Sequence, residues 1–338
     1  WVEDTTIFAG IRVVQGRDFG IDLDMQEYVE DNVTSMDIPK ERRDNPGAAA
    51  TKSELSEFRS CAGTLQWCVT QFFLQFAVDV SIIMSSVCDL TVANLIDLNH
   101  VVRDVRAASK QRLHFFSFPG VSWKEVPTVQ YADASPSNRP RGFSTGGLLT
   151  LLVGPSFRKG LEAPANVLAW RSFKLPRKVA GSNGGESQTL SFAEEAQWLV
   201  RLAWAEVHGT PLIRHQLHEA VRQISGALVT DSRGIYDASV KSESPQKGLR
   251  SPQSGVELEM ACDNALRCGT VLRWSHGGAM LADTLTKRSA LARRTFELFL
   301  GNNQRWRLVY DPKFQSERRR TRAGLARLVD FDLAAQDD

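Results

Sequence analysis

Four acidic residues fall at the predicted ends of separate secondary-structure elements. Asp133 and Asp231 each end a predicted strand. Glu186 is expected to open a long helix, and Asp283 the last helix. Strand ends and helix starts meet at one edge of an α/β sheet, so acids far apart in the sequence can converge there. Convergent carboxylates repel unless cations neutralise them. Because Mg²⁺ prefers carboxylate oxygens, the pattern predicts phosphodiester hydrolysis with two Mg²⁺ ions about 3.5 to 4 Å apart, Mn²⁺ being the expected substitute.

The order of elements from residue 123 to 300 predicts how these acids are positioned. We expect an α/β domain with a mixed five-stranded sheet flanked by helices, whose first three strands form an antiparallel meander. The long helix over 186–208 follows the third strand, and the remaining strands alternate with helices. The predicted strands cover residues 126–135, 142–154, 166–173, 226–231 and 270–274.

The part of the chain before residue 123 has a different pattern. Residues 5–14 alternate like a strand, and residues 25–33 read as a short helix. Thr51 and Glu54 match a capping box, and apolar residues at helical spacing follow it, so 49–122 is expected to be a mainly helical segment. We therefore divide the chain into 1–48, 49–122, an α/β domain at 123–300 and a basic tail at 301–338.

Composition excludes several classes of protein. The chain is 42% hydrophobic and 24% charged with a net charge of +2, which is ordinary for a globular protein. Its five cysteines include no CxxC pair, so neither a disulfide framework nor a zinc site is expected, and a reducing compartment fits best. The apolar run 72–88 falls short of the ~20 residues of a membrane helix, so no membrane partner is expected.

The residues around the acids resemble the reverse transcriptase and ribonuclease H region of the Pol polyprotein of copia-type long-terminal-repeat retrotransposons. Residues 131–135 (YADAS) are similar to the first acidic strand of that family, 142–147 (GFSTGG) to its second strand, and 169–174 (AWRSFK) to its third. Residues 281–287 (LADTLTK) nearly match its final motif. Gln188 replaces the second Glu of the family helix that begins at Glu186. Residues 8–11 resemble a Phe-Leu-Gly-Ile strand of the family, and 26–28 resemble the helix that follows its polymerase palm.

That resemblance implies a fold and an activity. It implies a ribonuclease H-like domain at 123–300, the end of the palm and thumb start at 1–48, and a thumb or connection segment at 49–122. It implies two Mg²⁺ ions, with Asp133 bridging both, Glu186 and Asp231 completing one coordination sphere and Asp283 the other. The substrate would be the RNA strand of an RNA/DNA hybrid, with the rest of the Pol polyprotein as partner.

The context of that activity follows from the same resemblance. It implies a cytoplasmic, virus-like-particle location, with the nucleus as the alternative. Because the chain opens on Trp1, we expect a piece of a longer polyprotein. Tyr28 to Asp31 mimics a polymerase box but falls in a predicted helix, so the catalytic palm is absent and no DNA synthesis is expected. The alternative function is an inactive or repurposed fragment that binds nucleic acid or a partner protein. The oligomeric state stays open.

From the sequence alone, several residues have two possible roles. Asp263, in a Cys-Asp-Asn stretch, and Asp237 are rivals to Asp231, which is preferred because it follows a clear strand. His276 is either a mobile aid to product release, as in related nucleases, or an ordinary loop residue. A basic group after the third strand either contacts the phosphates of a bound duplex or is a solvated loop: Arg171, Lys174, Arg177 and Lys178. The tail arginines 318–320 and 322 either add nonspecific nucleic-acid affinity or keep the chain soluble.

Overall fold

The structure is a computed structural model that describes residues 5–179, 181–240, 249, 251–310, 313–315, 317–326 and 328. Residues 241–248 and 250 lie outside the described residues. The same holds for Arg327 and 329–338 of the predicted tail and for the side chain of Arg318. No helix among the described residues is long and apolar enough to cross a membrane.

The chain begins with a small antiparallel sheet of strands β1 to β4 in sequential order. The prediction of one strand over 5–14 is wrong, because β1 turns back into β2 at Ala9 and Gly10, both with positive φ. A Cβ atom on Gly10 would lie 2.5 Å from the Tyr28 ring, so only glycine lets that ring pack against the turn. The four strands are Thr5–Phe8, Ile11–Gln15, Ile21–Asp24 and Leu113–Phe115.

A helical unit lies between β3 and β4 in sequence; it begins at Gln26, earlier than the predicted helical segment 49–122, which also includes β4. The capping box at Thr51 and Glu54 is present at the start of α3. Apolar faces of α3 and α5 form the centre of the unit, with Phe58, Leu65, Leu95 and Leu98 fully buried. The helices are α1 (Gln26–Asn32), α2 (Lys40–Arg43), α3 (Lys52–Gln71), η1 (Leu74–Phe76), α4 (Ala77–Met84), η2 (Val87–Asp89) and α5 (Val92–Ala107).

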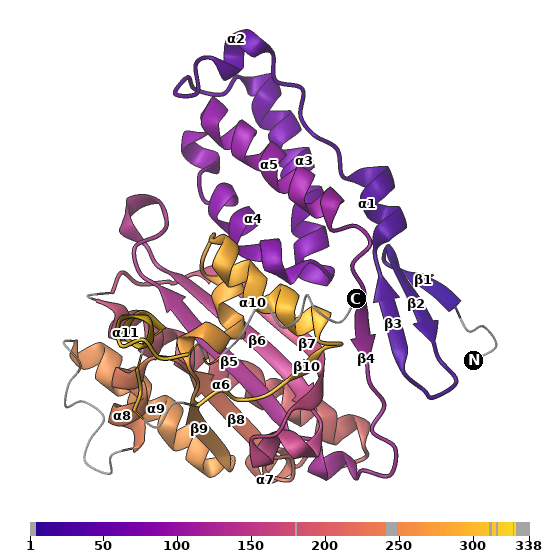
Figure 1. Ribbon diagram of the computed structural model, residues 1–338, viewed down its shortest axis with the longest axis vertical. Coiled ribbons are helices and arrows are strands. Elements are labelled where there is room, and N and C mark those ends of the chain that lie inside the picture. The colour runs from indigo at the N-terminus through magenta and orange to yellow at the C-terminus, as the bar shows by residue number, and fades with distance from the viewer. Residues whose placement is uncertain are drawn as a thin grey trace.

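A mixed sheet forms the second part, with strand order β10-β7-β6-β5-β8-β9 (Figure 1). The three antiparallel strands β5, β6 and β7 form the predicted meander, and β8 and β9 run parallel to β5. The predicted count of five strands differs from the six described, because Arg305 and Trp306 of β10 pair with Ala163 and Pro164 at the start of β7. The other strands are β5 (Thr128–Ser135), β6 (Thr145–Val153), β7 (Ala163–Lys174), β8 (Gly226–Thr230) and β9 (Thr270–Trp274).

Helices cover both faces of this sheet. One face packs against α6 (Ser182–Val207) and α9 (Pro252–Arg267), with Ala132 and Leu148 in that core. The other face, with Val129 and Tyr131, joins the core of the helical unit, η7 (Leu281–Leu285) and α10 (Ala290–Gly301). Side chains alternate along a strand, so Asp133 belongs to this second face. The remaining helices are η3 (Trp123–Glu125), η4 (Pro140–Gly142), η5 (Pro155–Lys159), α7 (Leu217–Arg222), α8 (Arg233–Val240), η6 (Gly277–Ala279) and α11 (Glu317–Arg322).

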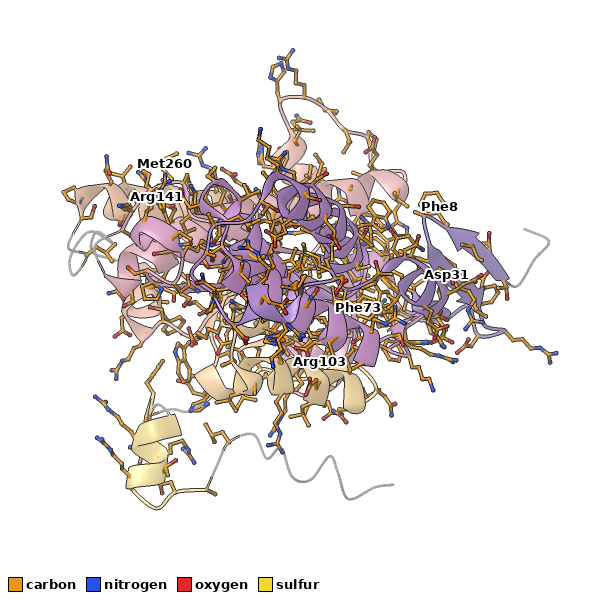
Figure 2. The ribbon with its side chains drawn as sticks, turned by 90° about the horizontal axis from the view of Figure 1, so that it is seen from above. Phe8, Asp31, Phe73, Arg103, Arg141 and Met260 are labelled. Atoms are coloured by element: carbon orange, nitrogen blue, oxygen red, sulfur yellow. The ribbon has the colours of Figure 1, made fainter. Side chains whose placement is uncertain are left out.

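The helical unit and the sheet share one continuous hydrophobic core rather than meeting at a thin contact. The indole Nε1 of Trp170 on β7 donates to the carbonyl of Val69 on α3 at 2.7 Å. The small sheet projects from one side of this body. Seen from above, Phe8 on the small sheet and Met260 on α9 lie at opposite sides of the molecule (Figure 2).

Candidate active site

Three of the four predicted acids meet at one end of the mixed sheet. Asp133 is the sixth residue of β5, Asp231 directly follows β8, and Asp283 lies in η7. One carboxylate oxygen from each lies within 4.8 Å of the other two. Because β5 and β8 are neighbouring parallel strands, their carboxyl ends reach the same edge. The structure therefore brings together side chains separated by up to 150 positions.

Asp283 reaches the site by a route that differs from the prediction. It does not open the last helix: η7 holds it in a short 3₁₀ turn, and α10 begins only at Ala290, capped by Ser289. Gly147 on β6, which pairs with Asp133, makes this possible. A Cβ atom there would lie 2.6 Å from Thr286 and 2.9 Å from Leu285, so the missing side chain lets the segment of Asp283 lie directly on the sheet.

Thr286 fixes the Asp133 carboxylate from this segment. Its hydroxyl donates to Oδ2 of Asp133, and both residues are almost fully buried. The carbonyl of Thr286 in turn accepts from the side chain of Asn138 at 2.8 Å. The amide oxygen of Asn138 accepts from the hydroxyl of Thr145 at 2.7 Å. A chain of hydrogen bonds therefore orients Asp133 before any ligand arrives.

Glu186 approaches the same end of the sheet from α6. The helix starts at Ser182, not at Glu186 as predicted, so Glu186 lies in its second turn. Gly185 allows the approach, since a Cβ there would lie 3.2 Å from Ala134 on β5. Glu186 is 7% exposed and is not part of the three-aspartate group. Its carboxylate is nevertheless close enough to Asp133 and Asp231 for their charges to act on it.

Burial and mutual repulsion raise the pKa of three of the acids. For Glu186, burial is the largest cause and the charges of Asp133 and Asp231 add to it, so its pKa lies well above the ordinary value. Burial, followed by the charge of Asp133, raises the pKa of Asp231 to about 6. The same two causes raise the pKa of Asp283 well above its ordinary value. The site therefore holds more negative charge than its surroundings stabilise, which is the condition that favours a bound cation.

Lys287 supplies positive charge to this cluster, and sequence reasoning assigned it no role. Its Nζ lies 2.5 Å from Oδ1 of Asp283 and 3.5 Å from Oδ2 of Asp133. Burial would lower the pKa of this ammonium, but the charges of Asp133, Asp283 and Asp231 outweigh burial and raise it. Lys287 lies four residues after Asp283, a spacing that favours an ion pair on a helical turn. This four-residue spacing is the feature of the sequence from which the ion pair between Asp283 and Lys287 could have been predicted.

The rivals of Asp231 lie elsewhere. Asp263 is exposed on α9, and Asp237 is on α8, where its carboxylate accepts from Arg233 at 3.4 Å. Neither belongs to the aspartate group. Asp231 is held in place through its backbone, because its carbonyl accepts from the indole Nε1 of Trp274 at 2.9 Å.

His276 is fully buried beside the site, not part of the carboxylate group. Its Nδ1 accepts from the backbone of Gly278 at 3.1 Å, and its Nε2 lies 3.0 Å from the carbonyl of Gln315. Its own backbone N–H donates to Val309 at 2.7 Å. Val309 and Gln315 therefore lie against this histidine. A role in product release would require these two residues to move away.

The four predicted phosphate contacts do not act alike. Lys174 and Lys178 are exposed, and their Nζ atoms lie 4.1 and 5.4 Å from the centroid of the Phe143 ring. Arg171 is exposed above Phe173. Arg177, by contrast, forms an ion pair with Glu257 and is half-buried. Lys174 on β7 pairs with Thr145 on β6, and Thr145 pairs with Ser135 on β5. Lys174 therefore lies at the end of the sheet that carries Asp133.

The donor set fits divalent ions of the Mg²⁺ type. Its members are oxygen ligands, the ligands that Mg²⁺ and Mn²⁺ prefer over nitrogen or sulfur. The spacing of the aspartate oxygens allows them to share one ion, and the raised pKa values show that their negative charge is poorly neutralised. Asp133, Asp231, Asp283 and Glu186 are the residues that would hold the metal.

No protein-family model matches the chain, and no curated protein matches it. Among solved structures, the chain is similar to the structure of the foamy viral protease-reverse transcriptase in complex with RNA/DNA hybrid. The identity is 14% and the TM-score 0.29, and the match covers 47% of this chain and 19% of that one. A similarity of this size carries no argument about function, which has to be drawn from the residues and the geometry.

Proposed function

We propose that this chain is the ribonuclease H part of a retroelement reverse transcriptase of the copia type, and that it hydrolyses the RNA strand of RNA/DNA hybrids. One observation supports this most strongly: Asp133, Asp231 and Asp283, from three separate elements, place carboxylate oxygens within 4.8 Å at the end of a mixed sheet. The sequence around Asp133 and Asp283 resembles motifs of that family. Asp231 is selected by geometry alone, because the stretch that resembles the family's Asp-Asn pair lies at Asp263 on α9, outside the aspartate group.

The chain's own residues prepare the reaction. Asp133, oriented by Thr286, is central to the cluster, and Glu186, Asp231 and Asp283 surround it. Bound among these acids, Mg²⁺ would activate a water molecule and neutralise the charge that develops on the departing 3′ oxygen. The depth of the site, with Asp133 1% exposed, keeps the carboxylates fixed while the substrate approaches.

The duplex would be held by phosphate contacts beside the site. Lys174 and Lys178 over Phe143, with exposed Arg171, present positive charge at the sheet end that carries Asp133. Such contacts position a duplex without reading its sequence. Selection of RNA over DNA requires recognition of the 2′-hydroxyl in the minor groove. Arg177 is not expected to contribute, because Glu257 already neutralises it.

A cleavage assay with separately labelled strands tests this function. We expect endonucleolytic cleavage of the RNA strand of a hybrid in Mg²⁺ or Mn²⁺, none after chelation, and none of a DNA duplex. Primer extension should give no templated product. Binding of the hybrid without turnover in either metal would contradict the nuclease and favour the alternative of a binding fragment.

A further inference from the structure

Lys287 occupies the position where a cation is expected to bind. Its ammonium lies between two of the acids that would ligate metal, 2.5 Å from Asp283 and 3.5 Å from Asp133. The same Oδ2 atom of Asp133 accepts the hydroxyl of Thr286, so the lysine and the threonine share one buried carboxylate. The arrangement is built into the segment, because the N–H of Lys287 donates to the carbonyl of Asp283 at 2.9 Å and fixes the turn that returns the side chain to the site.

The side chain of Lys287 can leave as well as enter. It is 36% exposed, whereas that of Asp283 is 17% and that of Asp133 2% exposed. A flexible four-carbon stem with one solvent-facing side can swing outward without opening the core. The carboxylates, by contrast, stay where the backbone of β5 and η7 places them. The lysine is therefore the mobile cation and the aspartates are the fixed anions.

A positive charge within a few ångströms of a metal site opposes the binding of a second cation. We propose that the Lys287 ammonium is a built-in counter-cation that competes with a divalent ion for the Asp133 and Asp283 carboxylates. It holds the acids together when metal is absent and swings out when metal enters. This inference rests on the proposed metal site and adds a determinant of its affinity.

If Lys287 competes with the metal, its removal should change metal affinity in the opposite direction to the removal of a metal ligand or of a residue that supports the site. Removing a residue that supports the site would weaken metal binding. Removing a competitor strengthens binding and leaves the metal-free carboxylates repelling one another. Lys287→Met keeps the length of the stem and removes only the charge. Lys159→Met is the matched control, because Lys159 is exposed on η5, after the end of β6 remote from the site.

The experiment measures Mn²⁺ binding by the electron paramagnetic resonance signal of free Mn²⁺, with no substrate present. It is paired with thermal unfolding with and without the metal. For Lys287→Met we expect binding roughly tenfold tighter than in the wild type, within the usual range of coupling between two sites. Without metal, the melting temperature of Lys287→Met should be lower than that of the wild type. The rise in melting temperature on adding Mn²⁺ should be larger for the variant than for the wild type. Lys159→Met should match the wild type in both measurements.

The outcomes separate this inference from the proposed function. If the wild type binds Mn²⁺ and Lys287→Met binds it equally or more weakly, the proposed competition is wrong, whereas the proposed metal site is supported. Binding by the variant alone would support the competition, since the lysine then blocks the site. No binding by either protein would overturn both. If Lys287→Met and Lys287→Gln fail to fold without metal, recovery of the wild-type circular dichroism spectrum on adding Mn²⁺ supports the inference, and no recovery contradicts it.

Discussion

Arg288 forms an ion pair with Asp79, 209 positions earlier in the chain, with Nε 2.7 Å from Oδ1. Asp79 is 1% exposed on α4, and its other oxygen accepts from Arg293 of α10 at 2.8 Å. The two arginines also reach Asp97 and Asp104 of α5. The helical unit is thereby attached to the segment that carries Asp283 and Lys287. Packing and charge together make the helices part of the support of the site.

Removal of this buried charge should destabilise the protein. Asp79→Asn leaves Arg288 and Arg293 with only their more exposed partners. We expect the free energy of unfolding in urea to fall on the order of 3 kcal/mol, the low end for a broken buried pair. Asp89→Asn is the control, because its pair with Arg141 is exposed and should contribute less than about 1 kcal/mol. Equal effects of the two variants would show that the Asp79 pair supports nothing.

Thr286 offers a test of how Asp133 is oriented. Thr286→Val keeps the shape of the side chain and removes the hydroxyl that donates to Asp133. We expect RNA cleavage at subsaturating Mg²⁺ to fall about 10- to 100-fold, as for other partners of metal ligands. Thr286→Ser retains the hydroxyl and should recover most of the loss. Similar rates for the valine and serine variants would mean that the hydrogen bond is not used.

The pH dependence of stability follows from the raised pKa of Asp231. A carboxyl group whose folded pKa lies above its unfolded value stabilises the protein fully below the unfolded value, and loses that stabilisation as the pH rises through about 6. The metal-free wild type should therefore lose stability relative to Asp231→Asn over this window in thermal unfolding. A difference in stability between the wild type and Asp231→Asn that does not change with pH would contradict the raised pKa of Asp231.

Binding of Mg²⁺ should restore the stability that the metal-free protein loses as the pH rises. Protons and divalent ions compete for the same carboxylates, so the rise in melting temperature on adding Mg²⁺ should be larger at about pH 8 than at about pH 5. Glu186 and Asp283, whose pKa values are also raised, act in the same direction. An equal or larger rise at the lower pH would mean that Mg²⁺ acts elsewhere on the chain.

The choice of the third acid can be tested by single substitutions. Asp231→Asn should lower cleavage by about 100-fold or more, because loss of a metal ligand costs several kcal/mol of transition-state stabilisation. Asp263→Asn and Asp237→Asn should retain cleavage near the wild-type rate, since both lie outside the aspartate group. Loss of cleavage in the Asp263 variant alone would assign the third acid to α9.

The sequence predicted the elements that carry strong local signals. The periodicity of β5 to β9 and the capping box at Thr51 were sufficient for the meander, the parallel strands and α3. The expectation that strand ends meet at one edge of the sheet was sufficient for Asp133 and Asp231, which are far apart in the chain. Asp283 joins them from a 3₁₀ turn and not from the predicted helix start. Short or irregular elements were missed. The two-residue strand β10 and the 3₁₀ turn of Asp283 have no periodicity, because tertiary contacts with β7 and Gly147 determine them.

The charges around the site could not be read from the sequence in the same way. Lys287 and Arg288 are adjacent, but one faces Asp133 and the other faces Asp79, which only the packing of α4 against η7 determines. His276 looked like an open loop residue because its contacts with Val309 and Gln315, more than 30 positions away, leave no local signal in the sequence. Arg177 looked like a phosphate contact because its partner Glu257 is 80 positions away.

Cleavage of a hybrid with a labelled RNA strand, by the wild type and by Asp133→Asn and Glu186→Gln in Mg²⁺, tests the central claim most directly. The carboxylate cluster predicts Mg²⁺-dependent fragments from the wild type and none from either variant, while both variants still bind the hybrid. Cleavage by Asp133→Asn and Glu186→Gln at the wild-type rate would contradict it.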